Sequence, residues 1–167
     1  MTESTPDATS DGTTYNILFV CTGNTCRSPM AYALARDAVA RRGFAHVGLA
    51  SAGIAAAVGE PAADNARTAV AELGLDLEDH RASQLTREMV HWADLILGMS
   101  PSHLEAANEL SGKGKTSLIT EFLDGPEAGR AVPDPVLGDL ALYRHTRDRL
   151  KKAIDAMLDR LEPILSP

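Results

Sequence analysis

The 167-residue chain lacks the features that mark several large protein classes. It holds only two cysteines, too few for the disulfide scaffold of a small secreted domain. No apolar run approaches the ~18 residues that a membrane span needs, and the N-terminus lacks a basic-then-apolar signal pattern. Acidic residues outnumber basic residues by 23 to 16, whereas general nucleic-acid binding needs a basic surface. We therefore expect a cytoplasmic protein that binds neither nucleic acid nor a membrane.

The hydrophobic content of 44% is enough for a sizeable core, and the length suits one globular domain. Residues 1–14 differ from the rest, because they contain Ser, Thr, Pro, Gly and Asp but no large apolar residue beyond Met1. This composition predicts a disordered tail at residues 1–14 and a single domain at residues 15–167. Three unpaired acidic residues belong to the tail, so the domain itself is only mildly acidic.

From residue 15 onward, short β-rich runs alternate with segments of helical period. Strands are predicted at residues 15–20, 47–50, 94–98 and 115–120. Helices are predicted at residues 28–42, 62–73, 86–92, 100–110 and 139–161, with an irregular stretch at 124–138. Strands separated by helices require right-handed crossovers, which predicts a three-layer, doubly wound α/β domain with a parallel sheet. Ligands bind beyond the carboxyl ends of such strands, so we expect the chemistry in the loops after residues 20, 50, 98 and 120.

Two of the predicted helices carry clear boundary or packing signals. Pro29 lies in the first turn of the helix at 28–42, and Gly43 follows that helix as a stop. The last helix has side chains at every third or fourth position that predict one buried stripe: Tyr143, Thr146, Leu150, Ile154, Met157 and Leu161.

The loop after the first strand carries most of the functional information. It contains Cys21, Thr22, Gly23, Asn24, Thr25, Cys26, Arg27 and Ser28, with five residues between Cys21 and Arg27. Five residues are enough for backbone N–H groups to surround one tetrahedral anion. Gly23 and Asn24 tolerate the positive φ that such a tight loop requires. The loop is therefore expected to bind a phosphate dianion.

Side chains at the end of this loop favour the same ligand. The planar guanidinium of Arg27 can donate to two phosphate oxygens at once. Ser28 is expected to cap the following helix, whose N-terminus attracts an anion. The same donors face Cys21 and favour its thiolate, which is the nucleophilic form. A cysteine at a strand end is otherwise most often a small buried hydrophobic residue, but the spacing to Arg27 and Ser28 favours a nucleophile.

Residues 17–31, ILFVCTGNTCRSPMA, resemble the low-molecular-weight protein tyrosine phosphatases, including the bacterial protein-arginine phosphatase branch. The resemblance extends through residues 51–53, the strand at Asp94, Asp134-Pro135 and the last helix. It implies a flavodoxin-like sheet of four parallel strands and phosphatase chemistry through a cysteinyl-phosphate, with no metal or cofactor. It also implies phosphorylated proteins as substrates and inorganic phosphate as a product.

The resemblance assigns further residues to the site. Asp134, between two prolines, matches the family's general acid, which protonates the leaving group and then activates water. Asn24 and Ser51 resemble residues that hold the loop by hydrogen bonds, and His80 occupies a similar supporting position. Cys26 matches a second cysteine that forms a reversible disulfide with Cys21 and protects the nucleophile.

The remaining histidines and cysteines offer no metal site. Cys21 and Cys26 have no other cysteine to join them, and the histidines are not clustered, so zinc binding is not expected. His46, His91, His103 and His145 are interpreted as ordinary surface or core residues.

Substrate choice rests on Thr25, Val136 and Leu137. Thr25 and the segment at residues 143–148 resemble the arginine-phosphatase branch, and a threonine hydroxyl makes the pocket floor smaller and more polar than an aliphatic side chain does. Val136 and Leu137 replace the aromatic residues that usually follow the Asp-Pro pair. We expect phosphoarginine as the substrate, with phosphotyrosine as the alternative. An arsenate reductase, which needs more cysteines, and an inactive phosphoprotein-binding module are weaker alternatives.

Overall fold

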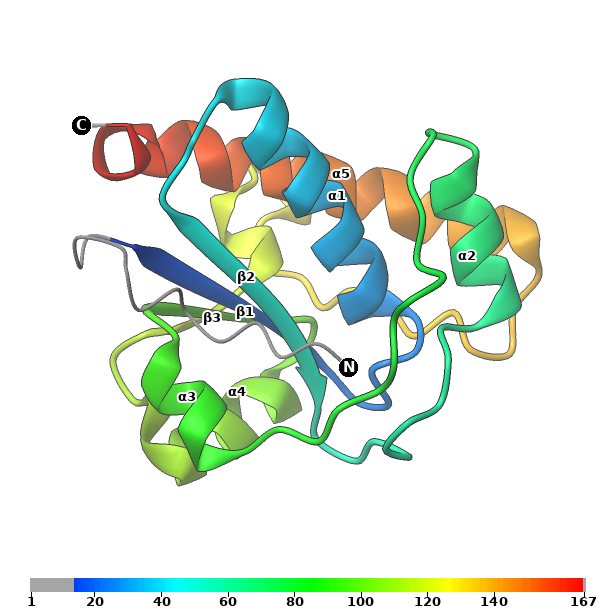
Figure 1. The fold of residues 1–167 in the computed structure, drawn as a ribbon, viewed down its shortest axis with the longest axis horizontal. Helices are drawn as coiled ribbons and strands as arrows, with labels where there is room; N and C mark the ends of the chain where they lie inside the picture. Colours follow the sequence, from blue (N-terminus) through cyan, green and yellow to red (C-terminus); the bar gives the residue numbers. More distant parts are fainter. Residues whose placement is uncertain (1–13, 167) are drawn as a thin grey trace.

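The computed structural model describes residues 14–166 and contains a four-stranded parallel sheet (Figure 1). Its order is β2-β1-β3-β4, formed by β1 Tyr15–Cys21, β2 Val47–Gly53, β3 Leu95–Gly98 and β4 Thr116–Leu118. The predicted parallel α/β sheet is therefore confirmed. The chain order reverses between β1 and β3, which makes their carboxyl ends the expected place for a ligand. All of the predicted tail except Thr14 lies outside the described residues.

Helices cover both faces of the sheet and complete three layers (Figure 1). One face packs against α1 Arg27–Arg42, α2 Asp64–Ala71 and α5 Leu140–Leu165. The other face packs against α3 Arg87–Trp92 and α4 Pro101–Ala107. Strand β1 supplies both cores, because Ile17 and Phe19 belong to the first and Leu18 and Val20 to the second. This central strand is buried on both sides, and its last residue, Cys21, lies on the face that α1 covers.

Local sequence signals account for the main helices. Gly43 ends α1 with the left-handed conformation, at φ 71°, that a glycine adopts without strain. The stripe predicted on α5 is buried at Tyr143, Thr146, Leu150, Ile154 and Met157, while Leu161 is partly buried at its edge. The long helix α5 therefore fixes the position of the loop that precedes it.

Several predicted boundaries were wrong by a few residues. Strand β2 continues to Gly53 because its pairing with β1 extends to the end of that strand. The helix predicted at 100–110 ends at Ala107 and becomes a wide turn, η1 Asn108–Gly112. The strand predicted at 115–120 ends at Leu118.

Other observed boundaries also differ from the predicted ones. The segment after β4 forms a 3-10 turn, η2 Ile119–Phe122, and a second turn, η3 Gly125–Glu127, lies in the stretch predicted to be irregular. Helix α2 is shorter than the predicted 62–73. Its N-cap, Ala63, is not helical, and the Ala63 amide donates to the Thr25 carbonyl at 2.9 Å. The last helix continues to Leu165, which is itself buried.

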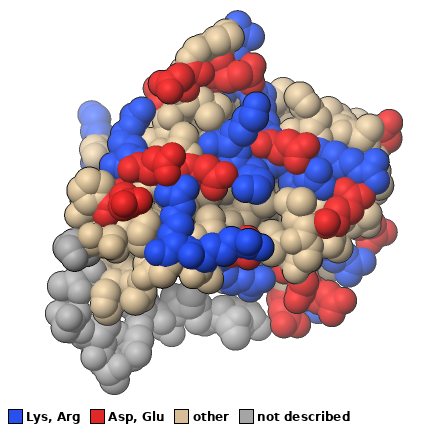
Figure 2. Space-filling view, turned by 90° about the horizontal axis from the view of Figure 1, so that it is seen from above, with Lys and Arg blue, Asp and Glu red and all other residues tan. Residues whose placement is uncertain are grey.

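The surface over α1 and α5 carries charges of both signs side by side (Figure 2). Ion pairs join α5 to the end of α1 and to the residue after α2, with Arg42 to Asp159 at 2.8 Å and Arg144 to Glu72 at 2.6 Å. Because acidic side chains lie beside the basic ones, the electrostatic potential over this face is not uniformly positive or negative.

Candidate active site

The loop between β1 and α1 lies at the carboxyl edge of the sheet (Figure 1). Strand β2 approaches it closely, and the amides of Ile54 and Ala55 donate to the carbonyls of Cys21 and Thr22. A Cβ on Gly53 would lie only 2.5 Å from the Thr22 carbonyl oxygen, so this approach requires glycine. The end of β2 therefore holds the first turn of the loop in place.

Cys21 is buried, and its Sγ lies 2.9 Å from Oγ of Ser28. The Asn24 side-chain amide donates to the same Ser28 oxygen at 2.7 Å, so the serine proton can point at the sulfur, which is nearer than its other acceptor, the Ala52 carbonyl at 3.5 Å. The prediction that Ser28 caps α1 was wrong: Cys26 is the N-cap, without a side-chain cap bond. Ser28 is drawn inward by Asn24 and faces the Cys21 sulfur instead.

Asn24 organises the loop from its centre. It is fully buried and adopts a positive φ of 57°, whereas Gly23, for which the same was predicted, does not. Its side-chain amide also donates to Oγ of Ser51 at 3.0 Å, while its backbone carbonyl lies 2.7 Å from Nε2 of His80. Burial lowers the pKa of His80. The neutral ring donates its Nε2 proton to that carbonyl, because a carbonyl can only accept.

Arg27 is 5% exposed, and only some of its N–H donors have hydrogen-bond partners. Its Nη1 donates to the Val132 carbonyl at 2.9 Å, and its Nη2 lies 3.6 Å from Oδ2 of Asp134. The Nε atom is buried and has no partner among the described residues. A buried donor without a partner is costly, so the free edge of this guanidinium is suited to an anion.

Asp134 reaches the site from the loop before α5. Its Oδ1 accepts a bond from the Val136 amide at 3.0 Å, which fixes the carboxylate, and its Oδ2 faces Arg27. The side chain is 42% exposed, so it can also meet a ligand from solvent. The structure therefore brings Cys21, Arg27 and Asp134 to one edge of the sheet.

The second cysteine of the loop lies in a different environment from the first. Cys26 is buried, and its Sγ lies 3.2 Å from the Tyr143 hydroxyl and 3.7 Å from Oγ1 of Thr25. Burial raises the pKa of the Cys26 thiol and also that of Tyr143. Both cysteines are free thiols. The raised pKa disfavours the Cys26 thiolate, which makes Cys26 a weaker nucleophile than an ordinary cysteine thiol.

Residues 16–164 match the family model described as low molecular weight phosphotyrosine protein phosphatase. The chain belongs to this family. It is therefore a cysteine-dependent protein phosphatase, and an arsenate reductase or an inactive binding module is not favoured.

Known relatives of this phosphatase share most of its length. The protein-arginine-phosphatase of Geobacillus stearothermophilus is 38% identical over 89% of this chain and 97% of the relative. A probable low molecular weight protein-tyrosine-phosphatase of Ralstonia nicotianae is 34% identical over 89% of this chain and 97% of the relative. Among solved structures, the YwlE arginine phosphatase from Geobacillus stearothermophilus is 37% identical, with a TM-score of 0.80, over 89% and 94% of the two chains.

The predicted selectivity residues lie on or beside the loop. The Thr25 side chain is partly exposed, and a Cβ on Gly23 would lie 3.7 Å from its Oγ1. Val136 and Leu137 follow Asp134 and are 54% and 97% exposed. These two aliphatic side chains are therefore free to meet a substrate in the phosphatase.

Sequence reasoning missed His103 as a residue of the site. It is buried on α4, and its Nε2 lies 3.0 Å from Oγ1 of Thr22. The signal that could have found it is the Ser-Pro helix start, because a side chain three residues after Ser100 turns back toward the loop before the helix. His46, His91 and His145 have no such contact with the loop among the described residues.

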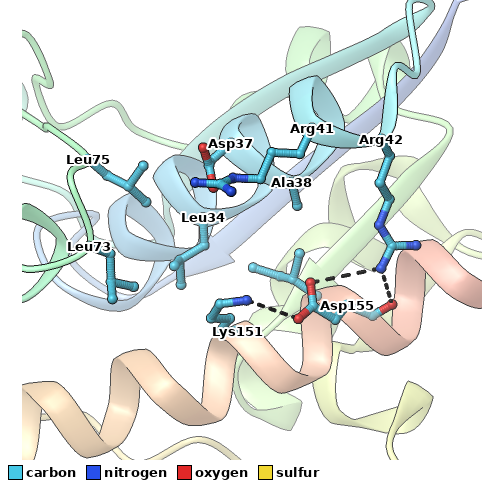
Figure 3. Close-up of a pocket in the computed structure, with 10 residues that line it drawn as sticks. Leu34, Asp37, Ala38, Arg41, Arg42, Leu73, Leu75, Lys151 and Asp155 are labelled. Atoms are coloured by element: carbon cyan, nitrogen blue, oxygen red, sulfur yellow. Dashed lines mark hydrogen bonds and ion pairs between the residues drawn. The ribbon is translucent and has the colours of Figure 1, made fainter.

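A separate pocket of about 280 Å³ lies between α1 and α5, away from the loop (Figure 3). Its cationic side chains already have acidic partners, since Arg41 contacts Asp37 at 2.8 Å and Lys151 contacts Asp155 at 3.1 Å. It is therefore a poor site for an anionic substrate. Within residues 14–166, no group of three or more His, Cys, Asp or Glu side chains is placed to hold a metal ion. No helix in the same range is long and apolar enough to cross a membrane.

Proposed function

We propose that this phosphatase hydrolyses phosphoarginine on proteins, with Cys21 as the nucleophile. The observation that supports this most strongly is the convergence of three groups: a buried sulfur 2.9 Å from a serine hydroxyl, a buried arginine with an unpartnered Nε, and a carboxylate 3.6 Å from that arginine. Loop amides and Arg27 bind the phosphoryl oxygens, where they also stabilise charge in the transition state.

The reaction proceeds by two displacements at phosphorus. In the first, the Cys21 thiolate forms an S–P bond while the N–P bond of phosphoarginine breaks, and Asp134 protonates the departing nitrogen. In the second, Asp134 takes a proton from water, whose oxygen attacks phosphorus and releases inorganic phosphate and the thiolate. The Ser28 hydroxyl stabilises that thiolate as a leaving group because its proton can point at the sulfur.

The residues that follow Asp134 support phosphoarginine over phosphotyrosine. Val136 and Leu137 are aliphatic, and their exposed fractions are 54% and 97%. A phenyl ring in this site would therefore have no aromatic wall to stack on at these two positions. The relative from Geobacillus stearothermophilus, named a protein-arginine-phosphatase, agrees with this choice.

The test compares phosphoarginine and phosphotyrosine peptides of matched sequence, with kcat/KM measured for each. We expect the phosphoarginine peptide to be hydrolysed faster, and Cys21→Ser to lose turnover while it still binds inorganic phosphate in a calorimeter. Faster hydrolysis of the phosphotyrosine peptide would overturn the substrate, and turnover by Cys21→Ser would overturn the nucleophile.

A further inference from the structure

A closed ring of hydrogen bonds joins the phosphate loop to the end of β3. Arg27 donates to the Val132 carbonyl, and the Val132 amide donates to the Met99 carbonyl at 2.7 Å. The Met99 amide donates to Nδ1 of His103, whose Nε2 contacts Oγ1 of Thr22 at 3.0 Å. The ring closes where Nη2 of Arg27 donates to the same Thr22 oxygen at 3.5 Å.

The backbone determines which nitrogen of His103 carries the proton. The amides of Met99 and Ser100 both donate to Nδ1 at 3.1 Å, so Nδ1 can only be an acceptor. Burial, and to a lesser extent the charge of Arg27, lowers the pKa of His103 to about 4, so the ring is neutral at neutral pH. Its single N–H proton must then be on Nε2, and His103 donates it to Thr22.

This arrangement leaves the Thr22 hydroxyl proton in a defined direction. The Thr22 oxygen accepts from His103 and from Arg27, which occupies both of its lone pairs. No acceptor for its proton is recorded among residues 14–166, and the Thr22 residue is exposed. The proton therefore points away from both donors, beside the guanidinium that has its Nε free.

We propose that Thr22 donates a hydrogen bond to the bound phosphoryl group and that His103 is the residue that positions Thr22. This inference rests on the proposed function of the loop as a phosphate site. Thr22 then extends the donor set of Arg27, and His103 acts only through the Thr22 hydroxyl. Gly98 makes the arrangement possible, because a Cβ there would lie 2.9 Å from the Cβ of His103.

The experiment measures the dissociation constant of inorganic phosphate by calorimetry and kcat/KM with para-nitrophenyl phosphate. Thr22→Val removes the hydroxyl and keeps the shape, whereas Thr22→Ser keeps the hydroxyl. His103→Asn keeps an acceptor for the two backbone amides but is too short to reach Thr22. His145→Asn is the matched control, since His145 is exposed on α5.

We expect Thr22→Val and His103→Asn each to weaken phosphate binding about tenfold, because each loses a hydrogen bond to a charged ligand. The double variant is expected to lose no more than either single variant. Thr22→Ser is expected to recover most of the phosphate affinity that Thr22→Val loses, and the control His145→Asn to bind phosphate as the wild type does. Losses that multiply to about a hundredfold in the double variant would overturn the proposal, as would unchanged binding by Thr22→Val.

Nitrogen NMR of the wild type gives an independent answer if His103→Asn fails to fold. A protonated Nε2 and an unprotonated Nδ1 are expected at neutral pH, and the opposite tautomer would overturn the role of His103. Failure of the proposed function looks different, because it would appear as faster hydrolysis of the phosphotyrosine peptide or as turnover by Cys21→Ser. Phosphate binding would still be measurable in that case, and an unchanged dissociation constant in Thr22→Val would still refute the inference.

Discussion

The Sγ of Cys21 and the Oγ of Ser28 lie 2.9 Å apart, although seven positions separate them in the chain. Asn24 brings them together, because its left-handed backbone turns the loop and its side chain donates to Ser28. The serine hydroxyl then has one proton to donate, and the sulfur at 2.9 Å is a nearer acceptor than the Ala52 carbonyl at 3.5 Å. The proposed nucleophile thus depends on a contact made by a residue in the middle of the loop.

Ser28→Ala removes this hydrogen bond and leaves the α1 N-terminus intact, because Ser28 is not its cap. A hydrogen bond to a charged group contributes ~1.5–3 kcal/mol, so release of the Cys21 thiolate from the cysteinyl-phosphate is expected to slow about tenfold or more. Rapid-quench measurement of the decay of the phosphoenzyme checks this. The control is Ser166→Ala at the exposed end of α5. An unchanged decay of the phosphoenzyme would show that Ser28 does not act on the sulfur.

Asp134→Asn tests the proton donor. The expected loss of kcat is about 10²–10⁴-fold for substrates whose leaving group must be protonated, the usual contribution of a general acid. Para-nitrophenyl phosphate is expected to lose less in the first step, because its leaving group is stable as an anion. Asp159→Asn, on an exposed position of α5, serves as the control. Equal losses for leaving groups of different basicity would contradict the acid role.

The local parts of this site could be predicted from sequence because neighbouring residues determine them. The run from Ile17 to Val20 is apolar on both faces, which predicts a central strand, and five residues from Cys21 to Arg27 predict an anion loop. These features depend on chain spacing and backbone chemistry alone. The family model that matches residues 16–164 is consistent with the same motif.

The parts that could not be predicted depend on contacts between distant segments. The bond between Thr22 and His103 spans 81 positions. The Ser-Pro start of α4 indicates that His103 turns back toward the loop before its helix, but not that Thr22 lies beside it. The prediction that Ser28 caps α1 was wrong for a related reason. A serine at a helix start usually caps the helix, but here Asn24 and the buried sulfur offer it better partners.

Thr25→Ile tests the selectivity residue by adding aliphatic bulk to the loop. The larger side chain fills the polar floor, which favours a flat phenyl ring over a guanidinium group. We expect the ratio of kcat/KM for phosphoarginine over phosphotyrosine peptides to fall about tenfold, within the range that small changes of pocket volume produce. Thr68→Ile, exposed on α2, is the control. The same ratio in Thr25→Ile and wild type would exclude Thr25 as the selector.

Glu72, just after α2, contacts two arginines of α5, with Nη2 of Arg144 at 2.6 Å and Nη1 of Arg147 at 2.7 Å. Hydrogen bonds from Arg144 and then Arg147 lower the pKa of Glu72 from 4.5 to about 2. The folded protein favours the ionised form of the Glu72 carboxylate. The interaction of Glu72 with the two arginines therefore makes its full contribution to stability above about pH 4.5. That contribution is lost as the pH falls toward about 2.

Glu72→Gln is therefore expected to lower the Tm at pH 7 and to change it much less near pH 2, where the wild-type carboxyl is itself partly protonated. Thermal unfolding followed by circular dichroism at several pH values measures the difference. Glu162→Gln, exposed near the end of α5, is the control because no ion pair to it is present within residues 14–166. A Tm difference that does not shrink between pH 4.5 and pH 2 would mean that the two arginines do not stabilise the ionised form of Glu72.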